Sequence, residues 1–332
     1  MVTYAFITLK DENLVLRFDI SSGLPKDRVD YKIPGGPAPL NINPAKTRLF
    51  VGLRDSNELG CIKINKDASL TLASTSPLPT DPCYVAIDKK GQTLFTSYYK
   101  AGQVAVHHYD EKNDTMTETQ RITTDTNAHS VWVASGNKHI FVPHTAANKI
   151  FLFNFDSNSG KISPNTPPWF TPDKHLEPRH MCFHPKLDLM YSVNEGSSTV
   201  SVYDLDQKNG ILKCKQTLST LPEQGIKDTI TAEIRITPNG KFLYATNRGH
   251  NSLACYTVDG TAGTLKFNTT IPAPTIPRVF DISPDGSYLY AAGQSSGELA
   301  TYEINQDTGI LKELSRFYIG KNPMWILPVV WA

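Results

Sequence analysis

Apolar and polar residues alternate along this chain in short stretches that recur about every fifty positions. Aligning the chain on its repeated turn positions gives spacings of 45, 46, 50, 53 and 46 residues. An aromatic residue stands six positions after each turn position, and apolar residues stand two and four positions before it. Alternation with a period of two predicts β-strands rather than helices. The turn positions are Pro44, Lys89, Ser135, Pro185, Pro238 and Pro284, and the aromatics are Phe50, Phe95, Phe141, Tyr191, Tyr244 and Tyr290.

Each repeat contains enough sequence for four strands. A turn signal such as Pro238-Asn239-Gly240 separates the first two strands, as a hairpin requires. A third alternating stretch follows, for example residues 198–203, and a fourth comes after an Asn-Gly turn, for example residues 211–214. Four short strands in every repeat predict the blades of an all-β propeller. A β-sandwich or two separate β-domains would not explain one register held over six repeats.

The two ends of the chain indicate a seventh blade. Residues 323–326 match residues 277–280, which puts a seventh turn position at Val330. Only one strand precedes that position, but residues 4–7 and 14–18 have the pattern of a second and a third strand. The sequence therefore predicts a seven-bladed β-propeller whose last blade takes strands from both ends, leaving no free edge. Residues 1–332 are expected to form one domain.

Composition and charge exclude several classes of partner. The chain has a formal net charge of +1 and a pI near 7.7, which gives no global case for binding nucleic acid or a membrane. The first residues lack a basic leader with a long apolar region. The five cysteines are scattered without CxxC spacing, as expected of buried thiols in a reducing cytosol.

The repeat register brings two sets of residues to one mouth of the propeller channel. The first strand of a blade crosses the disk and the second returns, so the residue before the first and the residue after the second meet on the same face. Six positions before the turns stand Ala38, Cys83, His129, Arg179, Ala232, Arg278 and Met324. Ten positions after them stand Arg54, Tyr99, Thr145, Glu195, Arg248 and Gln294, and Lys10 completes this ring from the N-terminal strand.

Five cations therefore surround one carboxylate and one histidine, a composition that favours an anionic small molecule. These charged groups also have structural interpretations that need no ligand. Arg54 and Lys10 could be solvated rim charges, His129 could be a structural histidine, and Arg179, Glu195 and Arg248 could form a structural ion-pair network.

Neighbouring polar residues add weaker signals. Asn194 and Asn247 precede two of the charges and are candidates for orienting substrate hydroxyls. His144 could support the pocket from behind the residues that line it. His180 and His184 flank an apolar strand and are expected to pack or to cap the turn.

Several catalytic motifs are absent from the sequence. It contains no GxSxG elbow, Walker loop, HExxH or paired-cysteine site. The predicted ring holds one carboxylate among cations, which does not suit a hard metal ion. No metal and no cofactor are expected.

Local strings in the chain resemble the lactonase-type seven-bladed propeller family, which includes bacterial 6-phosphogluconolactonases and fungal carboxy-cis,cis-muconate cyclases. The resemblance is closest to the bacterial branch and runs the length of the chain. It is carried by Pro-Arg-His-Met-x-Phe-His-Pro at 178–185, Val-Asn-Glu at 193–195, Ile-x-Ile-Thr-Pro-x-Gly at 234–240, Ala-Ala-Gly-Gln at 291–294 and Gly-x-x-Pro-Met-Trp at 320–325. By motif, the family's histidine, two arginines and glutamate fall on His129, Arg179, Arg248 and Glu195.

The resemblance implies hydrolysis of 6-phospho-D-glucono-1,5-lactone to 6-phosphogluconate in the pentose phosphate pathway. Either His129 or Glu195 would be the general base, and Arg179 would stabilise the oxyanion. Arg248, with Arg278, would bind the phosphate. Two alternatives stay open: a muconolactone-type cycloisomerase using the same groups, and a non-catalytic propeller that binds a protein.

Overall fold

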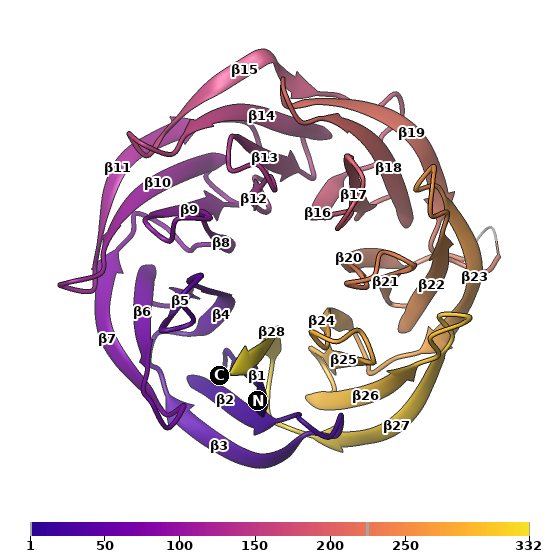
Figure 1. Cartoon of the computed structure of the whole chain (residues 1–332), viewed down its shortest axis with the longest axis horizontal. Coiled ribbons are helices and arrows are strands. Elements are labelled where there is room, and N and C mark those ends of the chain that lie inside the picture. Colours follow the sequence, from indigo (N-terminus) through magenta and orange to yellow (C-terminus); the bar gives the residue numbers. More distant parts are fainter. Residues whose placement is uncertain (1, 224–225, 332) are drawn as a thin grey trace.

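The computed structural model describes residues 2–223 and 226–331. In this part of the chain, 28 strands form seven four-stranded antiparallel sheets. Figure 1 shows them as blades arranged around a central axis, with the chain running round the ring in sequence order. The predicted all-β, seven-bladed propeller is confirmed.

The blades are numbered here in chain order, and each is written from its innermost strand outwards. Blade 1 comprises β4 (Pro37–Ile42), β5 (Arg48–Leu53), β6 (Glu58–Ile64) and β7 (Leu70–Pro77). Blade 2 comprises β8 (Tyr84–Ile87), β9 (Thr93–Tyr98), β10 (Gln103–Asp110) and β11 (Thr115–Thr123). Blade 3 comprises β12 (Trp132–Val133), β13 (His139–His144), β14 (Lys149–Asp156) and β15 (Lys161–Phe170). Blade 4 comprises β16 (Pro178–Phe183), β17 (Leu189–Asn194), β18 (Thr199–Asp206) and β19 (Ile211–Ser219).

The remaining blades follow the same plan. Blade 5 comprises β20 (Ile230–Ile236), β21 (Phe242–Arg248), β22 (Ser252–Val258) and β23 (Leu265–Pro272). Blade 6 comprises β24 (Pro277–Ile282), β25 (Tyr288–Gly293), β26 (Glu298–Ile304) and β27 (Leu311–Tyr318). Blade 7 comprises β28 (Pro323–Trp331), β1 (Val2–Leu9), β2 (Leu14–Asp19) and β3 (Lys26–Lys32).

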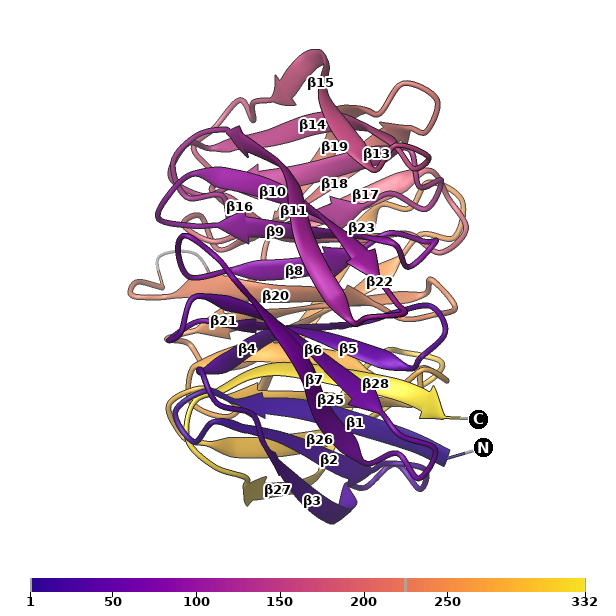
Figure 2. The ribbon, with the colours of Figure 1, turned by 90° about the vertical axis from the view of Figure 1, so that its left-hand side faces the viewer.

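Blade 7 closes the ring by joining the two ends of the chain. β28 pairs antiparallel with β1, with Ile326 opposite Ile7 and Trp331 opposite Val2. This confirms the predicted closure by an inner strand from the C-terminus and outer strands from the N-terminus. Both termini emerge on the same face of the disk (Figure 2). The start of β28 and the end of β1 therefore lie toward the opposite face.

Burial decreases from the second strand of a blade to the outermost strand. All six residues of β17 are buried, because its two faces pack against neighbouring blades. Along β27, on the rim, exposed and partly buried residues follow the single buried Leu311. This gradient explains why the alternation is clearest in the outer strands.

The repeated aromatic residue six positions after each turn position fastens its blade to the next one. All six of these side chains are fully buried. Three tyrosines donate hydrogen bonds to outer-turn carbonyls of the following blade: Tyr191 to Gly263 (2.9 Å), Tyr244 to Gly309 (2.8 Å) and Tyr290 to Gly23 (2.8 Å). Three phenylalanines pack against aromatic rings of the following blade: Phe50 on Tyr109, Phe95 on Phe155 and Phe141 on Phe183.

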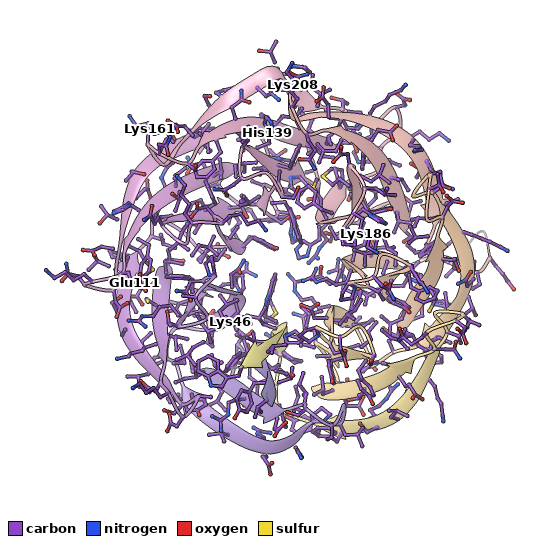
Figure 3. The ribbon with its side chains drawn as sticks, in the orientation of Figure 1. Lys46, Glu111, His139, Lys161, Lys186 and Lys208 are labelled. Carbon is purple, nitrogen blue, oxygen red and sulfur yellow. The ribbon has the colours of Figure 1, made fainter. Side chains whose placement is uncertain are left out.

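Side chains fill the blades and the spaces between them (Figure 3). None of the described residues forms a helix that could cross a membrane.

The inter-blade tyrosines provide a test of ring closure. Tyr290→Phe should lower the free energy of unfolding by about 1–2 kcal/mol, because the Gly23 carbonyl loses its buried donor. Urea unfolding monitored by fluorescence measures this. Tyr318→Phe is the matched control, since Tyr318 is 60% exposed on the rim. Equal stability of the two variants would contradict an inter-blade role for the Tyr290 hydroxyl.

Candidate active site

The site lies at the face of the disk where the inner strands begin. Pro178 on β16 pairs with Asn194 on β17, and Ile230 on β20 pairs with Arg248 on β21. Antiparallel pairing therefore brings the start of each inner strand beside the end of the next strand, as the repeat register predicts. Side chains from neighbouring blades meet there across the channel.

Bulges in the inner strands aim several of these side chains. The strand register shifts between Pro178 and His180, and again between Pro277 and Val279. Arg179 and Arg278 are the residues inside these two bulges. A β-bulge interrupts the normal alternation and can re-aim a side chain next to a functional site. Both arginines reach the channel in this way.

Glu195 joins two arginines from neighbouring blades, Arg179 on β16 and Arg248 on β21. Its Oε2 lies 3.0 Å from Nε of Arg179, and its Oε1 accepts a hydrogen bond of 2.8 Å from Nη2 of Arg248. Arg179 also donates to the carbonyl of Ala232, and Arg248 donates to the carbonyl of Thr231. The Arg179 contact is a close ion pair without hydrogen-bond alignment. The three charged groups form one connected network.

The charges on the arginines keep Glu195 ionised. Burial would raise its pKa, but Arg179 and Arg248 outweigh burial and hold the pKa below its usual value. Arg179 itself is only 2% exposed. An ionised carboxylate that both arginines stabilise is a weak proton acceptor. Its position suits holding the arginines better than acting as the base.

His129 is a buried, neutral imidazole close to this network. It is 5% exposed and precedes β12. Its pKa lies well below the usual histidine value, first because of burial and then because of Arg179 and other nearby cations. The ring packs edge-on against His180 at 5.0 Å and Tyr99 at 5.5 Å between centroids. Both ring nitrogens lie 4.0 Å from the sulfur of Cys83.

Arg278 is the channel arginine that is not committed to a protein partner. Among the described residues, its side chain makes no hydrogen bond and no ion pair. Burial and repulsion from Arg179 and Arg248 lower its pKa to about 9. It therefore stays protonated near neutral pH while lacking a counter-ion. Such a group favours an anionic ligand.

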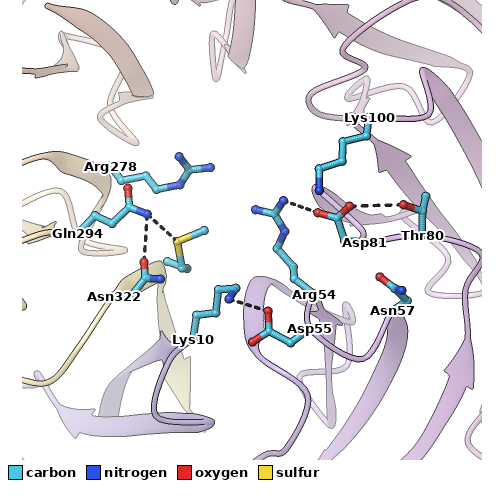
Figure 4. A pocket seen from close by; sticks show the side chains of 11 residues that line it. Lys10, Arg54, Asp55, Asn57, Thr80, Asp81, Lys100, Arg278, Gln294 and Asn322 are labelled. Atoms are coloured by element: carbon cyan, nitrogen blue, oxygen red, sulfur yellow. Dashed lines mark hydrogen bonds and ion pairs between the residues drawn. The ribbon is translucent and has the colours of Figure 1, made fainter.

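Two adjoining cavities share these residues. A small, partly enclosed cavity of about 20 Å³ is lined by Cys83, His129, Arg179, His180 and Arg278, together with apolar residues and Arg54. A wider, polar cavity of about 490 Å³ opens to the surface beyond it, and Arg54, Arg278 and Met324 border both. Figure 4 shows Arg278 and Arg54 projecting into the wider cavity from opposite sides. The wider cavity has the size of a small-ligand site.

The outer cations have carboxylate partners that the sequence analysis did not identify. Nη2 of Arg54 lies 2.5 Å from Oδ2 of Asp81, and Nζ of Lys10 lies 2.6 Å from Oδ1 of Asp55 (Figure 4). Lys100 also lines the wider cavity. Asp55 and Asp81 lie outside the two aligned ring positions, which is why the expectation of a single carboxylate at this mouth was wrong.

Asn194 and Asn247 point into their blades rather than into the channel. Both are fully buried. Asn194 donates to the hydroxyls of Thr199 and Ser201 and accepts from Ser192. Asn247 donates to the carbonyl of Thr220 and to the hydroxyl of Ser252, and accepts from Thr220. Strand alternation turns them away from the charged residues that follow them. We therefore propose structural roles for both amides.

A second histidine, His180, lies beside His129 and not at a turn. Its Nδ1 is 3.0 Å from Oε1 of Glu233, which also pairs with Arg235. His180 and Glu233 are 3% and 1% exposed. The sequence contained a usable signal, since both stand five positions before a turn position in neighbouring blades. His184 does cap its turn, by accepting from the backbone N–H groups of Lys186 and Leu187.

Metal-ligand clusters do not form in the described part of the chain. No group of three or more His, Cys, Asp or Glu side chains there could hold a metal ion.

The network around Glu195 predicts a pH-dependent stability effect. Glu195→Gln leaves two arginines without their counter-ion and should lower the free energy of unfolding at pH 7 by about 2 kcal/mol, less than the full cost of breaking a buried pair. A folded-state pKa below the unfolded value means that the charge stabilises the fold above the unfolded pKa. That stabilisation disappears as pH falls through the folded pKa. The difference from wild type should therefore narrow toward pH 3, as measured by urea unfolding.

The control for this variant is Glu111→Gln, which changes an exposed carboxylate on the outer rim (Figure 3). A Glu195→Gln difference that stayed constant between pH 7 and pH 3 would contradict the ion-network assignment.

Comparisons with known proteins give the family. The sequence model described as "Lactonase, 7-bladed beta-propeller" matches residues 13–328. A 6-phosphogluconolactonase of Enterobacter sp. (strain 638) is 33% identical over 297 residues, covering 89% of each chain, and one of Cronobacter sakazakii is 34% identical over 89% of this chain and 88% of its own. The solved structure of a periplasmic gluconolactonase of Pseudomonas aeruginosa superposes with a TM-score of 0.91 at 22% identity over 99% of both chains. This chain belongs to the lactonase family of seven-bladed β-propellers.

Proposed function

We propose that this enzyme hydrolyses 6-phospho-D-glucono-1,5-lactone to 6-phosphogluconate, a step of the pentose phosphate pathway. Relatives named 6-phosphogluconolactonase align over 89% of the chain. The observation that carries the proposal is a neutral histidine in a cation-lined channel, directly below an open cavity with excess positive charge. These are the groups that hydrolysis of a phosphorylated lactone requires.

The geometry favours His129 over Glu195 as the general base. A δ-lactone is an activated ester, so one base and one oxyanion stabiliser suffice. His129 is uncharged and lines the small cavity, whereas Glu195 is held ionised between two arginines. Arg179 is fixed by Glu195 and by the Ala232 carbonyl. We assign its guanidinium to the tetrahedral oxyanion.

The wider cavity suits the phosphate group. Its charged lining consists of Lys10, Arg54, Lys100 and Arg278 against Asp55 and Asp81, so four positive and two negative charges leave an excess of two. A phosphate dianion would balance that excess. Arg278 is the leading phosphate ligand because it has no protein partner among the described residues. Arg248 is committed to Glu195 and Thr231 and serves to hold Glu195.

Other parts of the proposal rest on less direct support. Closure of the ring by both ends supports a single domain over residues 1–332. The five cysteines are free thiols, which agrees with a cytoplasmic location. The expectation that all five are buried was wrong for Cys214, which is exposed on the outermost strand of its blade. Catalysis without a metal, and the absence of nucleic-acid or membrane partners, stay predictions. A carboxylated muconolactone is the alternative substrate that the same cations could hold.

The reaction and its base can be tested together. Purified protein in EDTA should hydrolyse freshly generated 6-phosphogluconolactone above the spontaneous rate. His129→Ala and Arg179→Lys should each lower kcat about a hundredfold or more, the usual contribution of a catalytic base or of an oxyanion donor. His108→Ala, at an exposed position of β10, is the control for the histidine change. Failure of the wild type on this lactone, with turnover of carboxymuconolactone, would transfer the assignment to the cycloisomerase reaction.

Arg278 provides a test of phosphate recognition. Arg278→Ala should raise KM for the phosphorylated lactone about tenfold to a hundredfold, the range of one lost charge-assisted hydrogen bond. It should leave KM for unphosphorylated glucono-1,5-lactone nearly unchanged. Arg316→Ala on the outer strand β27 is the matched control. An equal effect of Arg278→Ala on both substrates would remove Arg278 from the phosphate site.

A further inference from the structure

The small cavity beneath the mouth has the size and lining of a site for one water molecule. Its volume of about 20 Å³ exceeds the roughly 10–15 Å³ that one water needs. A water molecule there could contact Cys83, His129, Arg179, His180 and Arg278. A buried water also requires two to four polar partners, and these side chains can supply them. The cavity adjoins the wider one in which we place the substrate.

A water molecule in this cavity must find acceptors for its two hydrogens. Arginine side chains can only donate, so Arg179 and Arg278 cannot accept them. Neutral imidazoles each have one acceptor nitrogen. Two imidazoles line the cavity, those of His129 and His180, with their ring centroids 5.0 Å apart. They are the strongest acceptors among the cavity side chains.

Glu233 determines which nitrogen of His180 can accept. Burial would raise the pKa of Glu233, but Arg235 and then His180 lower it to about 2, so the carboxylate is ionised and only accepts hydrogen bonds. Nδ1 of His180, 3.0 Å away, must therefore donate. Burial lowers the pKa of His180 to about 4, so its ring is neutral near pH 7. The acceptor is then Nε2, and no group among the described residues donates a hydrogen bond to it.

We propose that His180 is a second catalytic histidine, an inference that rests on the proposed function. Its Nε2 accepts one hydrogen bond from the hydrolytic water in the small cavity, and Glu233 positions the ring by fixing its tautomer. His129 accepts the other hydrogen of the same water. The lone pairs of the water oxygen then point toward the arginine side of the cavity, where the lactone carbonyl enters.

The chemical step balances with these two histidines. The water oxygen forms a bond to the lactone carbonyl carbon while its proton passes to His129. The carbonyl π-electron pair moves to the carbonyl oxygen, beside the Arg179 guanidinium, and a tetrahedral intermediate forms. Collapse of this intermediate breaks the bond to the ring oxygen, which takes the proton from His129. His180 keeps its hydrogen bond to the attacking oxygen throughout and changes no bond of its own.

Two substitutions of His180 distinguish this role from a packing role. His180→Asn places an amide near the Nδ1 position, so it keeps a donor for Glu233 but removes the Nε2 acceptor. His180→Gln places an amide near the Nε2 position, so it keeps an acceptor for the water but removes the donor for Glu233. A packing role predicts that His180→Asn is the milder change. The proposed role predicts the reverse for catalysis.

The decisive measurement is steady-state hydrolysis of 6-phosphogluconolactone, together with thermal unfolding, for wild type and both variants. His180→Asn should lower kcat about a hundredfold with KM nearly unchanged, and His180→Gln should lose about tenfold or less. The control is His184→Asn, which keeps an acceptor for the turn after β16 and should retain wild-type kcat. Wild-type kcat in His180→Asn, or a lower kcat in His180→Gln than in His180→Asn, would overturn the proposal.

Glu233→Leu gives a second, independent readout if His180→Asn does not fold. Oε1 of Glu233 faces Nδ1 of His180 and also accepts from Arg235 and from the backbone N–H of Ile234, so leucine removes the acceptor that keeps the proton on Nδ1. The tautomer with the proton on Nε2 then becomes accessible and the acceptor for the water is lost, so kcat should fall about tenfold or more, in the direction known for a wrong tautomer in a catalytic triad. Glu233→Gln is the matched control, because its carbonyl can accept from the same three donors, and it should retain most of the activity. Arg235 still has Asp281 at 3.3 Å as a partner. Unchanged kcat in folded Glu233→Leu would overturn the proposal, whereas an inactive wild type would instead overturn the proposed function.

Discussion

The pairing of β28 with β1 is the constraint on which the rest of the structure depends. The residues of the site come from blades that are far apart in the chain, and none of these blades could place its charged side chains without the others. Closing the ring fixes the radius at which the inner strands begin. It also pairs the inner edge of β1, which would otherwise be an exposed strand edge that favours aggregation. The buried aromatics between blades transmit this constraint from one blade to the next.

Charge balance then divides the channel into two layers. In the deeper layer, every charge has a partner: Glu233 pairs with His180 and Arg235, and Arg235 also reaches Asp281. In the outer layer, cations outnumber carboxylates. A satisfied buried network makes a rigid base for the site. In the outer layer, burial and then the neighbouring arginines lower the pKa of Arg278, and the excess of cations favours an anionic ligand. The two layers meet at the small cavity that His129 and His180 line.

The repeat register made the fold and most of the site predictable from the sequence. It identified seven blades, the closure by both ends, and the joint position of Arg179, Glu195 and Arg248. It failed where the backbone departs from regular alternation. The bulges at the start of β16 and β24 re-aim the first residues of these strands, so a period of two could not show that His180 lines the same cavity as its neighbour Arg179. The repeat register missed Asp55 and Asp81 for a different reason: they lie outside the aligned ring positions.

The same bulges explain why two histidines can serve one water. A regular strand would send adjacent side chains to opposite faces, and Arg179 and His180 could not then line one small cavity. The irregular start of β16 allows both to do so, with Arg179 joined to Glu195 toward the mouth and His180 joined to Glu233 in the deeper layer. Each carboxylate thus fixes one group of the site: Glu195 fixes the arginine that we assign to the oxyanion, and Glu233 fixes the histidine that we assign to the water. A carboxylate that orients another group in this way cannot also be the base. The proton then passes to His129, whose imidazole contacts the Cys83 sulfur and has no carboxylate partner among the described residues.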